Sequence, residues 1–192
     1  MRRLIILLTI CLGTLVGHSQ TYSNIIPDSE IVSFLTWEIK STDGYSEESF
    51  LSPKRKIFYR ISDWDTLNFI KPDTLNDYEF LANLFFLYQD RNKLDTIFNQ
   101  EDRDFIFQQF TDIKDTLWQH KFPKAIITDK KNKKRPSRYY YSLPLFSKDK
   151  KHVIIKREYY CGSLCAHGGY FIYKRLDDKT WKLVTVVNRW VS

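Results

Sequence analysis

Two cysteines and a histidine lie close together in one glycine-rich segment near the end of the chain. Cys161 and Cys165 are separated by three residues, His167 follows, and three of the six glycines lie among them. In an oxidising compartment this pair predicts one disulfide at the tip of a hairpin. As free thiols, the same residues would suit copper(I) or zinc with His167 as a third ligand, or thiol redox chemistry. Oxidoreductases usually have two residues between their cysteines, so the spacing favours the disulfide.

A second chemical feature is a cationic run followed directly by aromatic residues. It contains six basic side chains and three tyrosines: Lys130, Lys131, Lys133, Lys134, Arg135, Arg138, Tyr139, Tyr140 and Tyr141. Cations beside aromatic rings can contact anionic groups while the rings stack on sugars or bases. Charge runs more often form a solvated loop, here with alternate tyrosines buried in a sheet. If this segment binds a partner, we expect an anionic glycan, a lipid headgroup or an acidic protein rather than nucleic acid.

The sequence contains no established catalytic motif. It has no Gly-x-Ser-x-Gly elbow, no phosphate-binding glycine loop and no His-Glu-x-x-His helix. Glu38 and Glu158 lie in apolar surroundings, where burial could raise the pKa of a carboxylate for acid catalysis. A hydrolase would need one of them beside a histidine in a cleft, and we name no catalytic residue and no cofactor. The first expectation is therefore a non-enzymatic binding domain, the second a metal or redox protein, and the third a hydrolase.

The start of the chain is typical of a secretory leader. Residues 1–3 are positively charged at two positions, residues 4–16 are apolar, and small residues precede a predicted cleavage after Ser19. The apolar run is too short for a comfortable membrane span, and we expect none in the mature chain. Cys11 lacks the small preceding residue of a lipid attachment site, so we expect a cleaved leader rather than a lipoprotein. The mature protein would then be periplasmic or secreted.

Composition favours one folded domain after this leader. The chain has 192 residues, of which 43% are hydrophobic and 16% aromatic. Such a composition argues against disorder, so we expect residues 1–19 to be a signal peptide and 20–192 to be one domain. The formal net charge is +7, from which cleavage would remove Arg2 and Arg3. A moderately basic protein favours anionic surfaces as partners.

The elements expected to position these residues are helices first and strands last. The helices are predicted to begin near Asp28, Asn76 and Asn99, and the strands to span 56–61, 124–127, 139–145, 152–161, 169–175 and 181–191. This order predicts an α+β fold, with about three N-terminal helices packed on one side of a C-terminal antiparallel meander of four to five strands.

The C-terminal third also resembles known sequences. Tyr159-Tyr160-Cys161-Gly162 leads to Cys165 and Gly168-Gly169, and the chain ends in Trp190-Val191-Ser192. This pattern is similar to the ends of small secreted proteins of unknown function from Bacteroidetes-like bacteria. The resemblance implies an exported protein of a Gram-negative cell. It implies no activity and no catalytic residue.

Overall fold

The computed structural model describes residues 21–41, 55–62, 64, 93–114, 117–128, 138–162, 165–177 and 180–192. Its named elements are α2 (Asp28–Ser41), β1 (Arg55–Phe58), α4 (Gln100–Thr111), β2 (Ala125–Thr128), β3 (Arg138–Tyr141), β4 (Leu145–Phe146), β5 (His152–Gly162), β6 (Cys165–Arg175) and β7 (Trp181–Val191). The predicted signal peptide, the predicted helix at Asn76 and basic residues 130–135 lie outside these residues.

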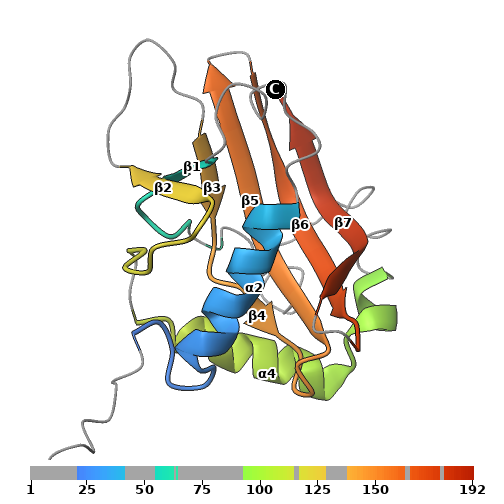
Figure 1. Cartoon of the computed structure of the whole chain (residues 1–192). Helices are drawn as coiled ribbons and strands as arrows, with labels where there is room; N and C mark the ends of the chain where they lie inside the picture. The colour runs from blue at the N-terminus through green and yellow to red at the C-terminus, as the bar shows by residue number, and fades with distance from the viewer. Residues whose placement is uncertain are drawn as a thin grey trace, which may run out of the picture.

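The strands form one mixed sheet of seven strands. Its order is β2-β1-β3-β5-β6-β7, and β4 pairs with β5 beyond the end of β3. β1 runs parallel to both β2 and β3, whereas β3, β5, β6 and β7 pair antiparallel in turn. Figure 1 shows α2 crossing one face of this sheet, with the ends of β5 and β7 rising beyond the helix. We call this part, where β5 turns into β6, the hairpin end.

This sheet contradicts the predicted fold. The structure is of mixed α+β composition, but the sheet has seven strands with parallel pairs, not four to five antiparallel strands covered by three helices. The parallel pairs involve short strands that lie far apart in sequence, such as β1 and β2 with Ile57 opposite Ile127. Hydrophobic periodicity identifies such strands but does not encode which partner each one pairs with.

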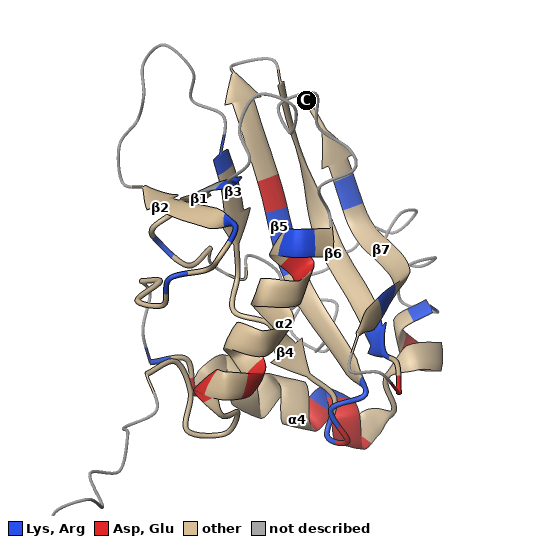
Figure 2. Ribbon diagram, in the orientation of Figure 1, with Lys and Arg blue, Asp and Glu red and all other residues tan. Residues whose placement is uncertain are grey.

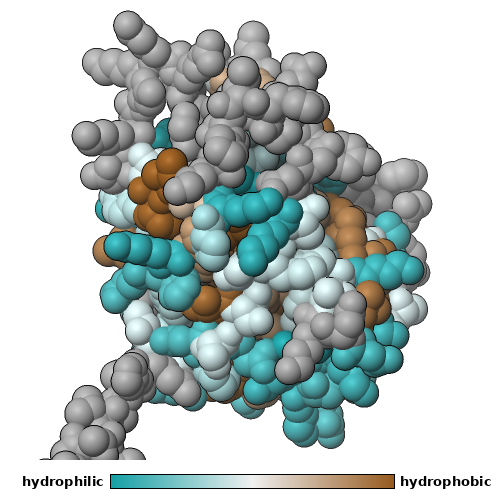
Figure 3. Space-filling model, in the orientation of Figure 1, coloured by the Kyte–Doolittle hydropathy of each residue, from teal (hydrophilic) through white to brown (hydrophobic). Residues whose placement is uncertain are grey.

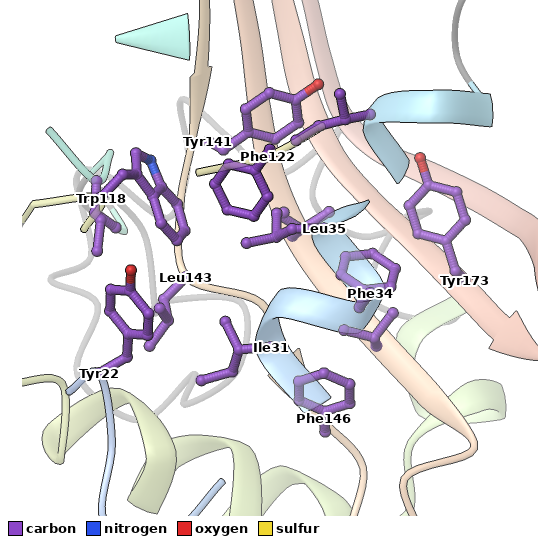
Figure 4. Close-up of a cluster of buried hydrophobic side chains, with 14 of the residues drawn as sticks. Tyr22, Ile31, Phe34, Leu35, Trp118, Phe122, Tyr141, Leu143, Phe146 and Tyr173 are labelled. Atoms are coloured by element: carbon purple, nitrogen blue, oxygen red, sulfur yellow. The ribbon is translucent and has the colours of Figure 1, made fainter. Parts of the chain in front are cut away.

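The first face of the sheet packs against α2. Phe34 and Ile31 from the helix are 0% exposed, and the ring of Phe34 meets Tyr173 and Trp181 at centroid distances of 5.6 and 5.1 Å. Figure 4 shows Ile31, Phe34 and Leu35 pointing from α2 into this cluster. The helix was predicted here because its apolar residues recur at helical spacing, and that prediction is confirmed.

The second face carries its own apolar cluster. Ile154, Ile172 and Val187 from β5, β6 and β7 pack with Ile106 of α4 and with Trp64. The middle strands are therefore buried on both faces, which explains the unbroken run of buried residues along β5 and β6. The prediction of one covered face did not allow for this second cluster.

α4 begins just after Asn99, where the sequence predicts a helix start, and the structure shows a capping box there. The Asn99 side chain accepts a hydrogen bond from the Asp102 backbone at 2.9 Å, and the Asp102 side chain accepts one from the Asn99 backbone at 3.3 Å. The helical spacing of Ile106, Phe110, Ile113 and Leu117 predicts a longer helix. The helix ends at Thr111, so Ile113 and Leu117 lie beyond it. None of the helices in the described part of the chain is long and apolar enough to cross a membrane.

Candidate functional site at the hairpin end of the sheet

The two cysteines pin the turn between β5 and β6. Cys161 and Cys165 form a disulfide with their Cα atoms 5.2 Å apart, and Gly162 lies opposite Cys165 in the ladder. The disulfide predicted from the sequence is thus confirmed. Because the sulfur atoms are bonded to each other, they are not available as the thiolate ligands that the metal alternative requires. Across the described ranges, no group of three or more His, Cys, Asp or Glu residues could hold a metal ion.

His167 lies on the α2 face of the hairpin, where its ring packs 5.3 Å from that of Tyr159. Burial lowers the pKa of His167, and the nearby cations Arg157 and Arg189 lower it further. This histidine is therefore biased toward its neutral form. Among the described residues, the groups that act on His167 are the Tyr159 ring and the cations Arg157 and Arg189.

The tyrosines that follow the basic run divide between the two faces of the sheet. Arg138, Tyr139, Tyr140 and Tyr141 form β3, and their side chains alternate because successive residues of a strand point to opposite faces. Tyr141 is 1% exposed and lies in the α2 core, so it is no part of a surface. Tyr139 points to the same face, half-buried, while Arg138 and Tyr140 point to the other. Lys130, Lys131, Lys133, Lys134 and Arg135 lie outside the described residues.

Four aromatic side chains cross the second face at the hairpin end, and we call them the aromatic row. Its members are Phe58 of β1, Tyr140 of β3, Tyr160 of β5 and Trp190 of β7. Successive ring centroids are 4.8, 5.1 and 5.9 Å apart, and successive ring planes are inclined by 40°, 71° and 56°. All four side chains are half-buried. The row is therefore a stepped aromatic surface that runs across the strands.

Arg138 adds a cation to this row. Its guanidinium carbon lies 5.1 Å from the ring centre of Phe58 and 5.4 Å from that of Tyr140. Both Nε and Nη1 of Arg138 are buried, and neither has a hydrogen-bond partner among the residues that the structure describes. Buried guanidinium nitrogens normally bond to an acceptor, so this arrangement is unusual.

A buried ion pair borders the aromatic row. Lys156 Nζ lies 3.5 Å from Glu158 Oε1, and the two side chains are 7% and 13% exposed. Glu158 lies opposite Tyr140 on one side and Gly168 on the other, so it shares their face. This face thus holds a largely buried carboxylate as well as cations beside the aromatic row.

A second set of polar side chains lies on the opposite face of the sheet, beneath α2. We call it the buried ion-pair network. Glu38 of α2 is 0% exposed and pairs with Arg157 of β5, while the Tyr173 hydroxyl donates to Glu38 Oε1 at 3.2 Å. Beside them, Arg55 Nη1 donates to the Tyr141 hydroxyl at 2.9 Å.

Burial and charge shift the ionisation of this network. Burial lowers the pKa of Arg157, but the negative charge of Glu38 outweighs it and leaves the pKa above its usual value. Burial and Glu38 both raise the pKa of Tyr173 and of Tyr141, so both phenols stay protonated. Glu38 has no exposed surface and pairs with an arginine, not a histidine. Glu38 therefore does not match the cleft acid that a hydrolase would require. Because its ion pair joins α2 to β5, the network instead connects the helix to the sheet.

Charge is distributed unevenly over the described surface. Glu101 and Asp102 occupy the first turn of α4. Figure 2 shows acidic residues together with basic ones around this helix, which lies away from the start of β3. In the view of Figure 3, hydrophilic side chains cover most of the described α2 face, with hydrophobic groups in separate places. The cationic start of β3 therefore lies away from the acidic first turn of α4.

No protein family, curated protein or solved structure matches this chain. The site must therefore be judged by its own geometry and charge. Sequence reasoning identified Arg138 and Tyr140, but it missed Phe58, Tyr160 and Trp190 as their neighbours. The aromatic residues were visible in the sequence, whereas the register that aligns them across four strands was not.

Proposed function

We propose that this chain is an exported, non-catalytic binding domain that recognises an anionic partner at the hairpin end of its sheet. The observation that carries the proposal is Arg138, a cation set between aromatic rings, with two buried nitrogens that have no acceptor among the described residues. The basic residues 130–135 directly precede it in the chain. Together they supply the positive charge and aromatic surface that an anionic ligand would contact.

Export is supported by two separate features. Residues 1–19 have the charge, apolar length and small terminal residues of a signal peptide. The Cys161–Cys165 disulfide would persist in an oxidising compartment such as the periplasm or the cell exterior. The intact mass of the naturally exported protein tests both. We expect a chain that begins at Gln20 and is two hydrogens lighter than its reduced form, and a reduced chain that retains residues 1–19 would overturn export.

Binding is tested with three anionic probes: polygalacturonate, phosphatidylglycerol vesicles and polyglutamate. We expect the mature protein to bind at least one of them, with an affinity that falls as salt rises, because exposed charges are screened. Failure to bind any anionic probe at low salt would overturn the proposal.

A triple variant locates the charge. Replacing Lys133, Lys134 and Arg135 with alanine should weaken binding and reduce its salt dependence. A matched control removes three exposed lysines elsewhere: Lys148, Lys151 and Lys182. Because both variants lose the same charge, equal weakening would indicate a general charge effect and contradict a site beside β3.

A further inference from the structure

Gly168 has an unusual role in the aromatic row. It lies opposite Trp190 in the ladder between β6 and β7. A Cβ atom at position 168 would lie 2.8 Å from Trp190 Nε1, 2.9 Å from Trp190 Cε2 and 3.0 Å from the Arg157 carbonyl oxygen. The indole thus lies directly over the glycine backbone of β6. It can reach Tyr160 on β5, at a centroid distance of 5.9 Å, because at the hairpin end of this face β6 carries only Gly168 and the small Ala166, which lies opposite Tyr160.

This arrangement makes the row continuous across the sheet. If the Trp190 indole did not lie over Gly168, the row would end at Tyr160 on β5. With it, the row extends from β1 to β7 and passes beside Arg138 and Glu158. The surface combines aromatic rings, a guanidinium donor and a carboxylate acceptor along one line.

We propose that this line binds an acidic polysaccharide laid across the strands, and that Gly168 positions Trp190 to complete it. The inference rests on the proposed function, since it names the class of anionic partner. Sugar rings offer apolar C–H faces to aromatic rings, hydroxyls that donate to a carboxylate such as Glu158, and, in uronic acids, a carboxylate that accepts from Arg138.

The other anionic classes fit the same surface less well. A bilayer is flat, whereas the rings are inclined to one another by 40° to 71° and are half-buried. A peptide of acidic residues alone has no hydroxyl group to donate to Glu158, which borders the row and is paired with Lys156. A polysaccharide with both hydroxyl and carboxylate groups can donate hydrogen bonds to Glu158 and accept them from Arg138.

Gly168→Ala tests the positioning role, and Gly162→Ala is its matched control. A Cβ atom at Gly162 meets nothing within 4 Å, so the control adds the same methyl group on the same hairpin without a clash. The probe is polygalacturonate, with uncharged dextran for comparison, and the readout is the dissociation constant at fixed salt. We expect Gly168→Ala to weaken polygalacturonate binding about tenfold or more, as the loss of one stacking contact would, and Gly162→Ala to leave it within about twofold.

Trp190→Leu provides a second variant if Gly168→Ala does not fold, and it should weaken binding by a similar factor. Thermal unfolding of each variant verifies that the fold is retained. Unchanged polygalacturonate affinity in folded Gly168→Ala and Trp190→Leu would overturn the inference. The proposed function would still stand in that case if replacing Lys133, Lys134 and Arg135 with alanine weakened binding. Binding of vesicles or polyglutamate but not polygalacturonate would overturn the glycan class alone. Binding of no anionic probe would overturn both.

Discussion

Replacing Glu38 with alanine should lower the free energy of unfolding by about 3–5 kcal/mol. The carboxylate is 0% exposed, and it holds both the Arg157 guanidinium, whose side chain is 16% exposed, and the Tyr173 hydroxyl. Its removal leaves a charged group and a hydroxyl in the core without their shared acceptor. Such a loss is a large share of the 5–15 kcal/mol that stabilises a typical domain.

Glu30→Ala is the matched control, because it makes the same substitution on the same helix. Glu30 pairs with Arg175, but each of these side chains is 28% exposed. A pair that water reaches contributes at most about 1 kcal/mol. In urea unfolding followed by circular dichroism, with a slope of about 2 kcal/mol per molar, the midpoint should fall by about 2 M for Glu38→Ala and by about 0.5 M or less for Glu30→Ala.

The double variant Glu38→Leu with Arg157→Met separates charge from packing. A buried ion pair replaced by apolar residues of similar size often loses little stability, so the double variant should recover most of the loss. Equal midpoints for Glu38→Ala and Glu30→Ala would refute the conclusion that this network anchors α2. A double variant no more stable than Glu38→Ala would refute the assignment of the loss to an uncompensated charge.

Three further outcomes follow from single features of the fold. Burial raises the pKa of Asp112, but hydrogen bonds from Asn24 and Ser23 outweigh it and leave the pKa below its ordinary value of 3.8. The stability that the ionised Asp112 side chain contributes is therefore present above pH 3.8 and is lost as the pH falls through its lower folded pKa. When the melting temperature is measured against pH, Asp112→Asn should show a smaller drop on the acid side than the unsubstituted protein. An unaltered profile would contradict this. Phe34→Ala should cost about 3–5 kcal/mol in chemical unfolding, and a loss below about 1 kcal/mol would show that α2 does not depend on this ring. Replacing both disulfide cysteines with serine should cost only about 2 kcal/mol, because the closed loop is short, and complete unfolding would contradict that small value.

The helices show what local sequence can predict. Asn99 caps α4 as expected, and the structure adds a capping box with Asp102. α2 begins at Asp28 after a proline, also as expected. The end of α4 was predicted too late because apolar residues continue at helical spacing after Thr111. Asp112 instead accepts hydrogen bonds from Asn24 and Ser23, a contact between distant segments that local periodicity does not reveal.

The sheet shows where local sequence is insufficient. The segment 139–145 was predicted as one strand, but β3 ends at Tyr141 and β4 begins at Leu145, with Pro144 between them. Proline has no backbone N–H to donate to a ladder, which is consistent with this break. The parallel pairing of β1 depends on partners elsewhere in the chain, and so do the neighbours of Arg138 in the aromatic row. The sequence therefore identified candidate side chains, but it did not predict how the sheet arranges them.

Three consecutive residues of β5 divide the molecule into two parts. Lys156 and Glu158 pair on one face of the sheet, and Arg157 pairs with Glu38 on the other. Toward the start of β5, both faces are covered by the two apolar clusters. Toward the hairpin end, both faces carry aromatic rings near cations, and the disulfide closes the turn.

This division separates stability from recognition. The apolar clusters lie on one side of the charged residues, so substitutions there should reduce folding and binding together. The aromatic row lies on the other side, where its rings are half-buried and contribute less burial to the core. Trp190→Leu should therefore alter affinity at nearly unchanged melting temperature, whereas Phe34→Ala should lower the melting temperature and leave the affinity of the remaining folded protein unchanged. The opposite pattern would mean that the hairpin end belongs to the folding core and that its aromatic residues are structural.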